Sequence, residues 1–277
     1  MGDTKVGCVL EQVELVAEES VQIDTPNGVL RGTLYVLGDE AFPVPGLILG
    51  TGLGASRRQV HWLARCLSMY DLAVLTFDLP GHDDSPGTAG LRMMDDMRAA
   101  VRFMASHPAV LPGSVMVGGQ CLCGSLAVHI AAEFEEVKAV FGLGIVPEHR
   151  VLRPYFWEYM ICSVTSPEIA WPRAINQSEV RALLATMDVR QAVQRLRVPL
   201  LLIHYSEDRL CPVDVIRQVY DRASCPKRLA LIDGGFHSAA YHDPQVASVL
   251  SEWIAALRQA GRLPESPRRG ALRTQTA

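Results

Sequence analysis

A short glycine-flanked segment, Gly119-Gln120-Cys121-Leu122-Cys123-Gly124, constrains the fold of this chain more than any other feature. It follows an apolar run at residues 115–117 and precedes helix-forming residues from 122 to about 136. A strand, a sharp turn and a helix in this order are typical of a nucleophile elbow, which holds one reactive side chain above a sheet. The usual elbow reads G-x-S-x-G, and here cysteine occupies the nucleophile position. The segment therefore predicts covalent catalysis by a thiol.

The rest of the chain alternates apolar runs with helix-like segments. Residues 13–25 and 29–37 predict a hairpin, because the turn signal Pro26-Asn27-Gly28 separates them. Further strands are expected at 47–49, 73–77, 115–117, 137–145, 200–204 and 228–232, and helices at 61–69, 91–106, 122 to about 136, 213–222 and about 244–260. Short continuous apolar strands are typical of buried parallel strands. The alternation predicts an α/β fold with a mainly parallel central sheet flanked by helices.

Residues 146–198 interrupt the alternation and predict a helical cap inserted into the sheet domain. Five aromatic residues in it would roof a pocket: Tyr155, Phe156, Trp157, Tyr159 and Trp171. An alternative of equal weight is that these side chains only anchor the insertion to the core. We therefore expect a core of residues 1–145 and 199–261, a cap at 146–198, and a disordered tail at 262–277, which contains two prolines and lacks apolar periodicity.

Composition excludes several classes of function. The chain has 277 residues, is 49% hydrophobic and carries a formal net charge of -4, so it can bury a large core and lacks the basic footprint of a nucleic-acid-binding protein. No apolar run approaches the ~18 residues that span a bilayer, and residues 1–10 do not resemble a signal peptide. Seven cysteines, an odd number, suit reduced thiols in a cytoplasm. We expect a cytoplasmic protein with a small-molecule substrate, no nucleic-acid or membrane partner, and a homodimer as an open alternative.

The sequence predicts neither a cofactor nor a metal. It contains no Gly-x-Gly-x-x-Gly pattern after a strand and no phosphate-binding loop that ends in Gly-Lys-Ser/Thr. The pair Cys121 and Cys123 lacks a second closely spaced pair of Cys or His of the kind that binds zinc. Catalysis by the side chains and backbone of the chain itself is therefore expected.

Four motifs, in the order of the expected strands, resemble those of the α/β-hydrolase fold over about residues 20–260. Gly50-Thr51-Gly52-Leu53-Gly54 is similar to the oxyanion loop His-Gly-x-Gly. Asp78-Leu79-Pro80-Gly81-His82-Asp83-Asp84-Ser85 is similar to the signature D-x-P-G-H-G-x-S. The elbow is the third motif, and residues 206–212 and 234–237 resemble the acid and histidine loops. The resemblance implies an α/β-hydrolase fold with a helical cap insertion and a cysteine-type elbow similar to that of dienelactone hydrolases.

This resemblance implies a triad of Cys121, Asp208 and His237, in the order nucleophile, acid, base. The thiolate of Cys121 would attack an acyl carbon, His237 would accept and return a proton, and Asp208 would orient the imidazole. The positive end of the elbow helix would favour the thiolate. The backbone N–H groups of Leu53 and Leu122 would form the oxyanion hole.

Alternatives remain at these positions. Cys121 could be a small filler on a decayed elbow, although strained turns rarely persist without a use. Glu207 competes with Asp208 for the role of the acid, and motif position favours Asp208. Three residues depart from the family pattern, in which Gly, His and Gly are usual: Cys123, Thr51 and Asp83. The departures indicate a specialised member rather than a general esterase.

A thiol nucleophile narrows the chemistry, because a thioester acyl-enzyme resists water more than it resists amines or thiols. The first hypothesis is a hydrolase for an ester, lactone or thioester of a small organic or secondary-metabolite substrate, since the elbow resembles that of dienelactone hydrolases. The second is an acyltransferase, cyclase or other bond-forming biosynthetic enzyme, because polyhydroxyalkanoate synthases also use such an elbow. The third is a non-catalytic small-molecule-binding protein on the same fold. Faster turnover with an added acceptor would favour the second, and an unreactive thiol with tight ligand binding would favour the third.

Overall fold

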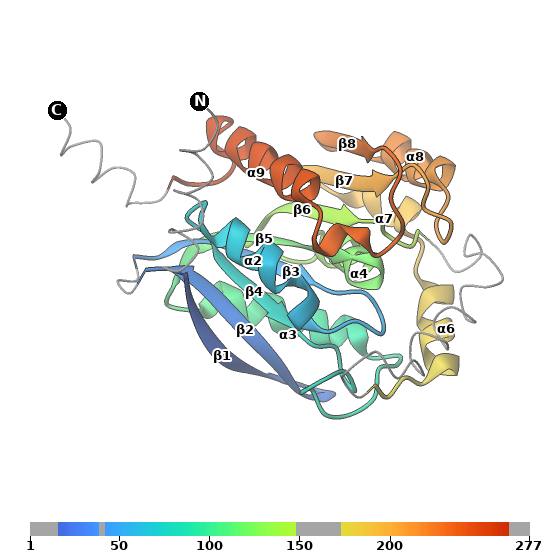
Figure 1. The fold of residues 1–277 in the computed structure, drawn as a ribbon, viewed down its shortest axis with the longest axis horizontal. Coiled ribbons are helices and arrows are strands. Elements are labelled where there is room, and N and C mark those ends of the chain that lie inside the picture. Colours follow the sequence, from blue (N-terminus) through green and yellow to red (C-terminus); the bar gives the residue numbers. More distant parts are fainter. Residues whose placement is uncertain (1–15, 39–41, 148–172, 266–277) are drawn as a thin grey trace.

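A computed structural model of the chain describes residues 16–38, 42–147 and 173–265 (Figure 1). Within these ranges, eight strands form one sheet in the order β1-β2-β4-β3-β5-β6-β7-β8. The strands are β1 Val16–Thr25, β2 Gly28–Leu37, β3 Val44–Gly50, β4 Ala73–Phe77, β5 Val110–Gln120, β6 Val137–Leu143, β7 Leu200–Tyr205 and β8 Lys227–Ile232. The pairs β1–β2 and β2–β4 are antiparallel, and the other pairs are parallel. The predicted α/β fold with a mainly parallel sheet is confirmed.

Helices cover both faces of the sheet. They are α2 His61–Ser68, α3 Met93–Ser106, α4 Cys121–Ile130, α6 Gln177–Thr186, α7 Val189–Arg195, α8 Val213–Arg222 and α9 Pro244–Gln259, with the short 3-10 helices η1 Arg57–Val60 and η3 Ala239–Tyr241. One hydrophobic cluster joins the sheet to α3, α4, α7 and α8, and a second joins it to α2 and α9. Alternate side chains of β3 enter the two clusters: Ile48 enters the first, and Leu47 and Leu49 the second. This explains why the central strands read as continuous apolar runs.

The ends of several elements differ from those that the sequence predicts. The hairpin and its turn are confirmed. Gly28 in the turn has a φ of 122°, a backbone conformation that residues other than glycine rarely adopt. The elbow helix α4 was expected to reach about residue 136, and it ends at Ile130 instead. The chain has to turn early because Val115 N–H donates to Glu136 O (3.0 Å) and β6 begins at Val137, beside β5. The return of the chain to the sheet, rather than the helix propensity of residues 131–136, sets this boundary.

The expected cap is described only in part. Its five aromatic residues, Tyr155, Phe156, Trp157, Tyr159 and Trp171, lie outside the described residues, as does the expected tail from residue 266 onward. Residues 173–175 form bridges with the loop that follows β4, namely Arg173 with His82 and Ile175 with Ala89. Helix α7 packs against α4 and α8 (Figure 1). In the described ranges, each helix is too short or too polar to cross a bilayer.

Candidate active site

Strand β5 passes directly into helix α4 at a strained turn. Cys121, the first residue of α4, has a φ of 53°, in the left-handed region that residues other than glycine rarely adopt. The neighbouring backbone is so close that a Cβ on Gly119 would lie 2.4 Å from Gly50 O, and one on Gly124 would lie 2.5 Å from Gly119 O. The two glycines therefore let the turn form, and the turn holds the thiol at the amino end of α4. This backbone has the geometry of a nucleophile elbow.

His237 and Asp208 come together from the loops that follow β8 and β7. Nδ1 of His237 donates to Oδ2 of Asp208 (2.7 Å), and both side chains are buried. Oδ1 of the same carboxylate accepts from the N–H groups of Leu210 and Cys211 (2.9 Å each). Glu207, the competing acid, is exposed. Because a carboxylate accepts at Nδ1, the neutral imidazole keeps its proton there and presents Nε2 as an acceptor.

Nε2 is the nitrogen of His237 that is left for Cys121, whose charge acts on this ring. It is buried and has no hydrogen-bond partner among the described residues. Burial disfavours the charged ring, but the negative charge of Cys121 and the hydrogen bond to Asp208 outweigh burial and raise the pKa of His237 to about 10. The ring therefore carries its second proton at neutral pH when a thiolate stands beside it. Cys121, His237 and Asp208, the residues of the predicted triad, thus lie in one site.

The loop after β3 offers one free backbone donor between two that are engaged. Gly52 N–H donates to the hydroxyl oxygen of Tyr241 (3.0 Å), and Gly54 N–H donates to Nε2 of His82 (2.8 Å). Between them, Leu53 N–H makes no hydrogen bond within the described ranges. Leu122 N–H lies in the first turn of α4, where N–H groups lack a partner inside the helix. Both donors that were expected to form an oxyanion hole are therefore available.

The elbow tolerates Cys123, where glycine was expected, because its neighbour is small. Cys123 is fully buried, and a Cβ on Gly50 would lie 2.6 Å from the Cys123 Cβ. Burial raises the pKa of the Cys123 thiol, so this second sulfur stays protonated and is not a competing nucleophile. Thr51, where histidine is usual, is buried and its hydroxyl has no hydrogen-bond partner among the described residues. The anchoring of this loop falls instead to Gly52 and Gly54.

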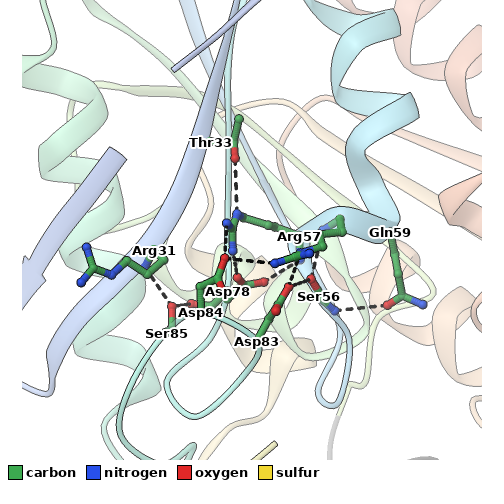
Figure 2. A network of polar contacts seen from close by, with 10 residues as sticks. Arg31, Thr33, Ser56, Arg57, Gln59, Asp78, Asp83, Asp84 and Ser85 are labelled. Carbon is green, nitrogen blue, oxygen red and sulfur yellow. Dashed lines mark hydrogen bonds and ion pairs between the residues drawn. The ribbon is translucent and has the colours of Figure 1, made fainter. Parts of the chain in front are cut away.

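A network of ion pairs fastens the same loop from the side of η1 (Figure 2). The backbone N–H of Arg57 donates to Oδ1 of buried Asp78 (2.7 Å). The guanidinium group of Arg57 contacts Oδ2 of the same carboxylate and also Asp84. Arg58 pairs with Asp83 (2.7 Å) and Asp84 (3.2 Å). The three carboxylates lie close enough to share a metal ion, but each of them already pairs with Arg57 or Arg58. Asp83, which stands where glycine is usual, thus has a structural use.

His82 should make the free energy of unfolding depend on pH. Its Nδ1–H donates to Pro80 O (3.0 Å) while Nε2 accepts from Gly54, and burial lowers the pKa of His82 to about 4. The unfolded chain binds a proton near pH 6.5, so the folded state should lose stability as the pH falls from about 6.5 to about 4, by roughly 3 kcal/mol for this group. Denaturant titrations at pH 7 and pH 4 should show this loss in the wild type, and a smaller loss in His82→Gln. An equal loss in both proteins would contradict the assignment.

Two residues of the site were not foreseen in the sequence. Gln120 precedes Cys121 and Tyr241 follows the histidine loop, and both side chains are buried beside Gly52. Gln120 occupies the variable position of the elbow motif and Tyr241 lies outside the motifs, so neither residue type was a signal in itself. Of the other histidines, His204 is buried, and its Nε2 is hydrogen-bonded to Cys211 O (2.9 Å).

Comparisons with known proteins agree with this architecture. The chain matches the family model for serine aminopeptidase S33 over residues 172–245 and the model for the dienelactone hydrolase family over residues 86–149. An uncharacterized protein of Mycobacterium tuberculosis is 24% identical over 236 residues, which are 84% of this chain and 75% of that protein. Each match covers part of the chain or has low identity, so the sequence matches indicate a distant relationship.

Solved structures align over most of the chain. The structure of DcsB in complex with its substrate analogue has a TM-score of 0.72 at 15% identity, over 88% of this chain and 99% of that chain. The esterase domain of a Rhodothermus marinus protein has a TM-score of 0.62 at 22% identity, over 88% and 98%. With the strand order and the elbow, these likenesses show that the chain has the α/β-hydrolase fold.

Proposed function

We propose that this protein is a hydrolase that cleaves an ester, lactone or thioester of a small organic molecule through a thioester acyl-enzyme at Cys121. One observation carries the proposal. A thiol held at a φ of 53° at the start of α4 shares its site with His237, and Asp208 orients that imidazole through a 2.7 Å hydrogen bond. Covalent catalysis requires a nucleophile, a base close enough to exchange a proton with it, and a group that orients the base.

The reaction follows from these positions. The thiolate of Cys121 attacks the acyl carbon, and the oxygen that becomes negative accepts hydrogen bonds from the N–H groups of Leu53 and Leu122. The bond to the leaving group breaks as that group takes a proton from Nε2 of His237, which leaves a thioester on the sulfur. Water then gives a proton to Nε2 and attacks the thioester. Release of the acid restores the thiolate and the protonated imidazole.

The comparisons support hydrolysis as the first choice among reactions of this site. One matching family model is that of dienelactone hydrolases, and one aligned structure is described as an esterase domain. Cysteine at the nucleophile position supports acyl transfer as the second candidate, because amines and thiols attack thioesters more readily than water does. Both candidates share the acyl-enzyme and differ only in the acceptor.

The test is to trap that intermediate. The protein would be mixed with short-chain p-nitrophenyl esters, small lactones and acyl thioesters, quenched in acid, and examined by intact mass and peptide mapping. We expect the mass of one acyl group, on the peptide that carries Cys121, and its loss in neutral hydroxylamine. Faster decay with added amine or thiol would favour transfer. Absence of an adduct, with Cys121 no more reactive toward iodoacetamide than Cys225, would contradict the proposal and favour a binding protein.

A further inference from the structure

A chain of buried hydrogen bonds links three loops of the candidate site. Gly52 N–H donates to the hydroxyl oxygen of Tyr241 (3.0 Å), and that hydroxyl donates to Oε1 of Gln120 (2.8 Å). Nε2 of Gln120 donates to the backbone carbonyl of His237 (2.9 Å). This series of hydrogen bonds thus connects the oxyanion loop, the elbow and the histidine loop. Its members lie far apart in the sequence, and each loop supplies one part of the proposed catalytic machinery.

The direction of each hydrogen bond is determined. Gly52 N–H can only donate and the carbonyl of His237 can only accept, so the hydroxyl of Tyr241 must donate its single proton to Gln120. The amide of Gln120 is therefore oriented with its oxygen toward Tyr241 and its nitrogen toward His237. Both side chains are almost fully buried, at 2% and 3% exposure. A Cβ on Gly52 would lie 2.3 Å from Oε1 of Gln120, so the contact also requires glycine there.

Hydrogen bonds on both sides hold Gly52, the residue that precedes the free donor of the oxyanion loop. Tyr241 fixes the N–H of Gly52, and the carbonyl of Gly52 accepts from Ala55 N–H (3.1 Å). The Gly52 carbonyl and the Leu53 N–H belong to one planar trans peptide group and point in opposite directions. Fixing the carbonyl therefore fixes the Leu53 N–H. At the other end, the same chain holds the backbone of His237, whose ring is held by Asp208.

We propose that Gln120 and Tyr241 are positioning residues, which act through Gly52 and the His237 carbonyl to align the oxyanion donor of Leu53 and the base with Cys121. The hydrogen bonds assigned above use the hydroxyl of Tyr241 and both ends of the Gln120 amide, so neither side chain needs to touch the substrate. The inference rests on the proposed acyl chemistry for its catalytic consequence. Its structural part, the order of the oxyanion loop, stands independently of turnover.

The experiment is Tyr241→Phe, which removes one hydroxyl and keeps the ring. Amide exchange measured by NMR should speed up at least about tenfold at Gly52, while Gly54, held by His82, should exchange as in the wild type. With an ester that forms the acyl-enzyme, kcat should fall about 10- to 100-fold and KM should change less than about threefold, because a donor used only in the transition state is misaligned. Alkylation of Cys121 by iodoacetamide should stay within about twofold, because displacement at a saturated carbon develops no oxyanion.

Two further variants sharpen the comparison. Gln120→Met should give the same pattern, and the double variant should be no worse than the more severe single one, because both break one chain. Tyr205→Phe is the matched control. It removes a buried tyrosine hydroxyl that donates to Asp243 (2.6 Å) and has no link to Gly52. Exchange at Gly52 and kcat should both stay close to the wild type in this control.

The outcomes separate the two proposals. Unchanged exchange at Gly52 in Tyr241→Phe and Gln120→Met would overturn the positioning role, whatever the turnover. Unchanged kcat in both variants, with an active wild type, would overturn its catalytic consequence. Faster exchange at Gly52 in a wild type and variant that both fail to form an acyl-enzyme would support the positioning of the loop and overturn the proposed function instead.

Discussion

Replacing Cys121 with alanine is expected to lower kcat/KM toward an acyl-enzyme-forming ester by about 10⁴- to 10⁶-fold. The substitution removes the sulfur that acts on His237 from the first residue of α4, and water in its place has neither the nucleophilicity nor the fixed position of the thiolate. The oxyanion donors and the base remain, so the residual rate should still exceed that in buffer. Steady-state kinetics at pH 7.5, with an active-site titration of the wild type, would measure the difference.

The matched control for this prediction is Cys225→Ala. That thiol is also buried, and burial raises the pKa of Cys225, so the side chain is neutral and lies outside the site. Its removal should leave kcat/KM within about threefold of the wild type. A Cys121→Ala protein that keeps a tenth of the activity would show that another group attacks the substrate.

Asp208→Asn is expected to lower kcat by about 10⁴-fold while the protein stays folded. An asparagine amide can donate to Nδ1 of His237, and the neutral ring then carries its proton on Nε2. In that form Nε2 cannot accept a proton from the Cys121 thiol or from water. The hydrogen bond to Asp208 also raises the pKa of His237, so the substitution should lower that pKa. The loss of kcat should be accompanied by slower alkylation of Cys121 near neutral pH.

Glu207→Gln is the control for the acid. Glu207 precedes Asp208 in the chain and is exposed, with no hydrogen bond to His237. Neutralising it should change kcat less than about twofold, since an exposed charge is screened by solvent. A large loss in Glu207→Gln with little loss in Asp208→Asn would reverse the assignment of the acid.

The sequence predicts the fold where local signals and tertiary contacts agree. Strand β4 and helix α8 have the predicted bounds: β4 is an apolar run that is buried throughout, and α8 buries Ile216 and Val219. Strand β5 was expected only at residues 115–117 but spans Val110–Gln120, although Pro112 and Gly113 are turn formers. Its early residues join the sheet through a shift in register, with Val44 opposite Val110 and Gly46 opposite Val115. Pairing with a neighbouring strand decides such a boundary, and a local pattern cannot reveal it.

The residues of the candidate site likewise fall into those that local motifs indicate and those that only tertiary contacts reveal. Motif order indicates the triad and the oxyanion loop, because each motif is a local turn with its own residue requirements. The partners of those motifs are not local. Gln120 bonds to Tyr241 and Arg57 to Asp78 across long stretches of sequence, and nothing in the spacing of these residues links them. Side-chain contacts of this kind exist only once the sheet has brought the loops to one edge.

The order of the strands has a consequence for how the protein becomes reactive during synthesis. Cys121 follows β5 in the middle of the sheet, whereas Asp208 follows β7 and His237 follows β8, the last two strands at one border. During synthesis, Cys121 therefore leaves the ribosome well before His237, the base that we propose for it. In the proposed mechanism, Cys121 therefore gains its acid and base only after β7 and β8 have been made and have joined the sheet. A truncated or partly folded chain that lacks these strands should not form the acyl-enzyme by this mechanism.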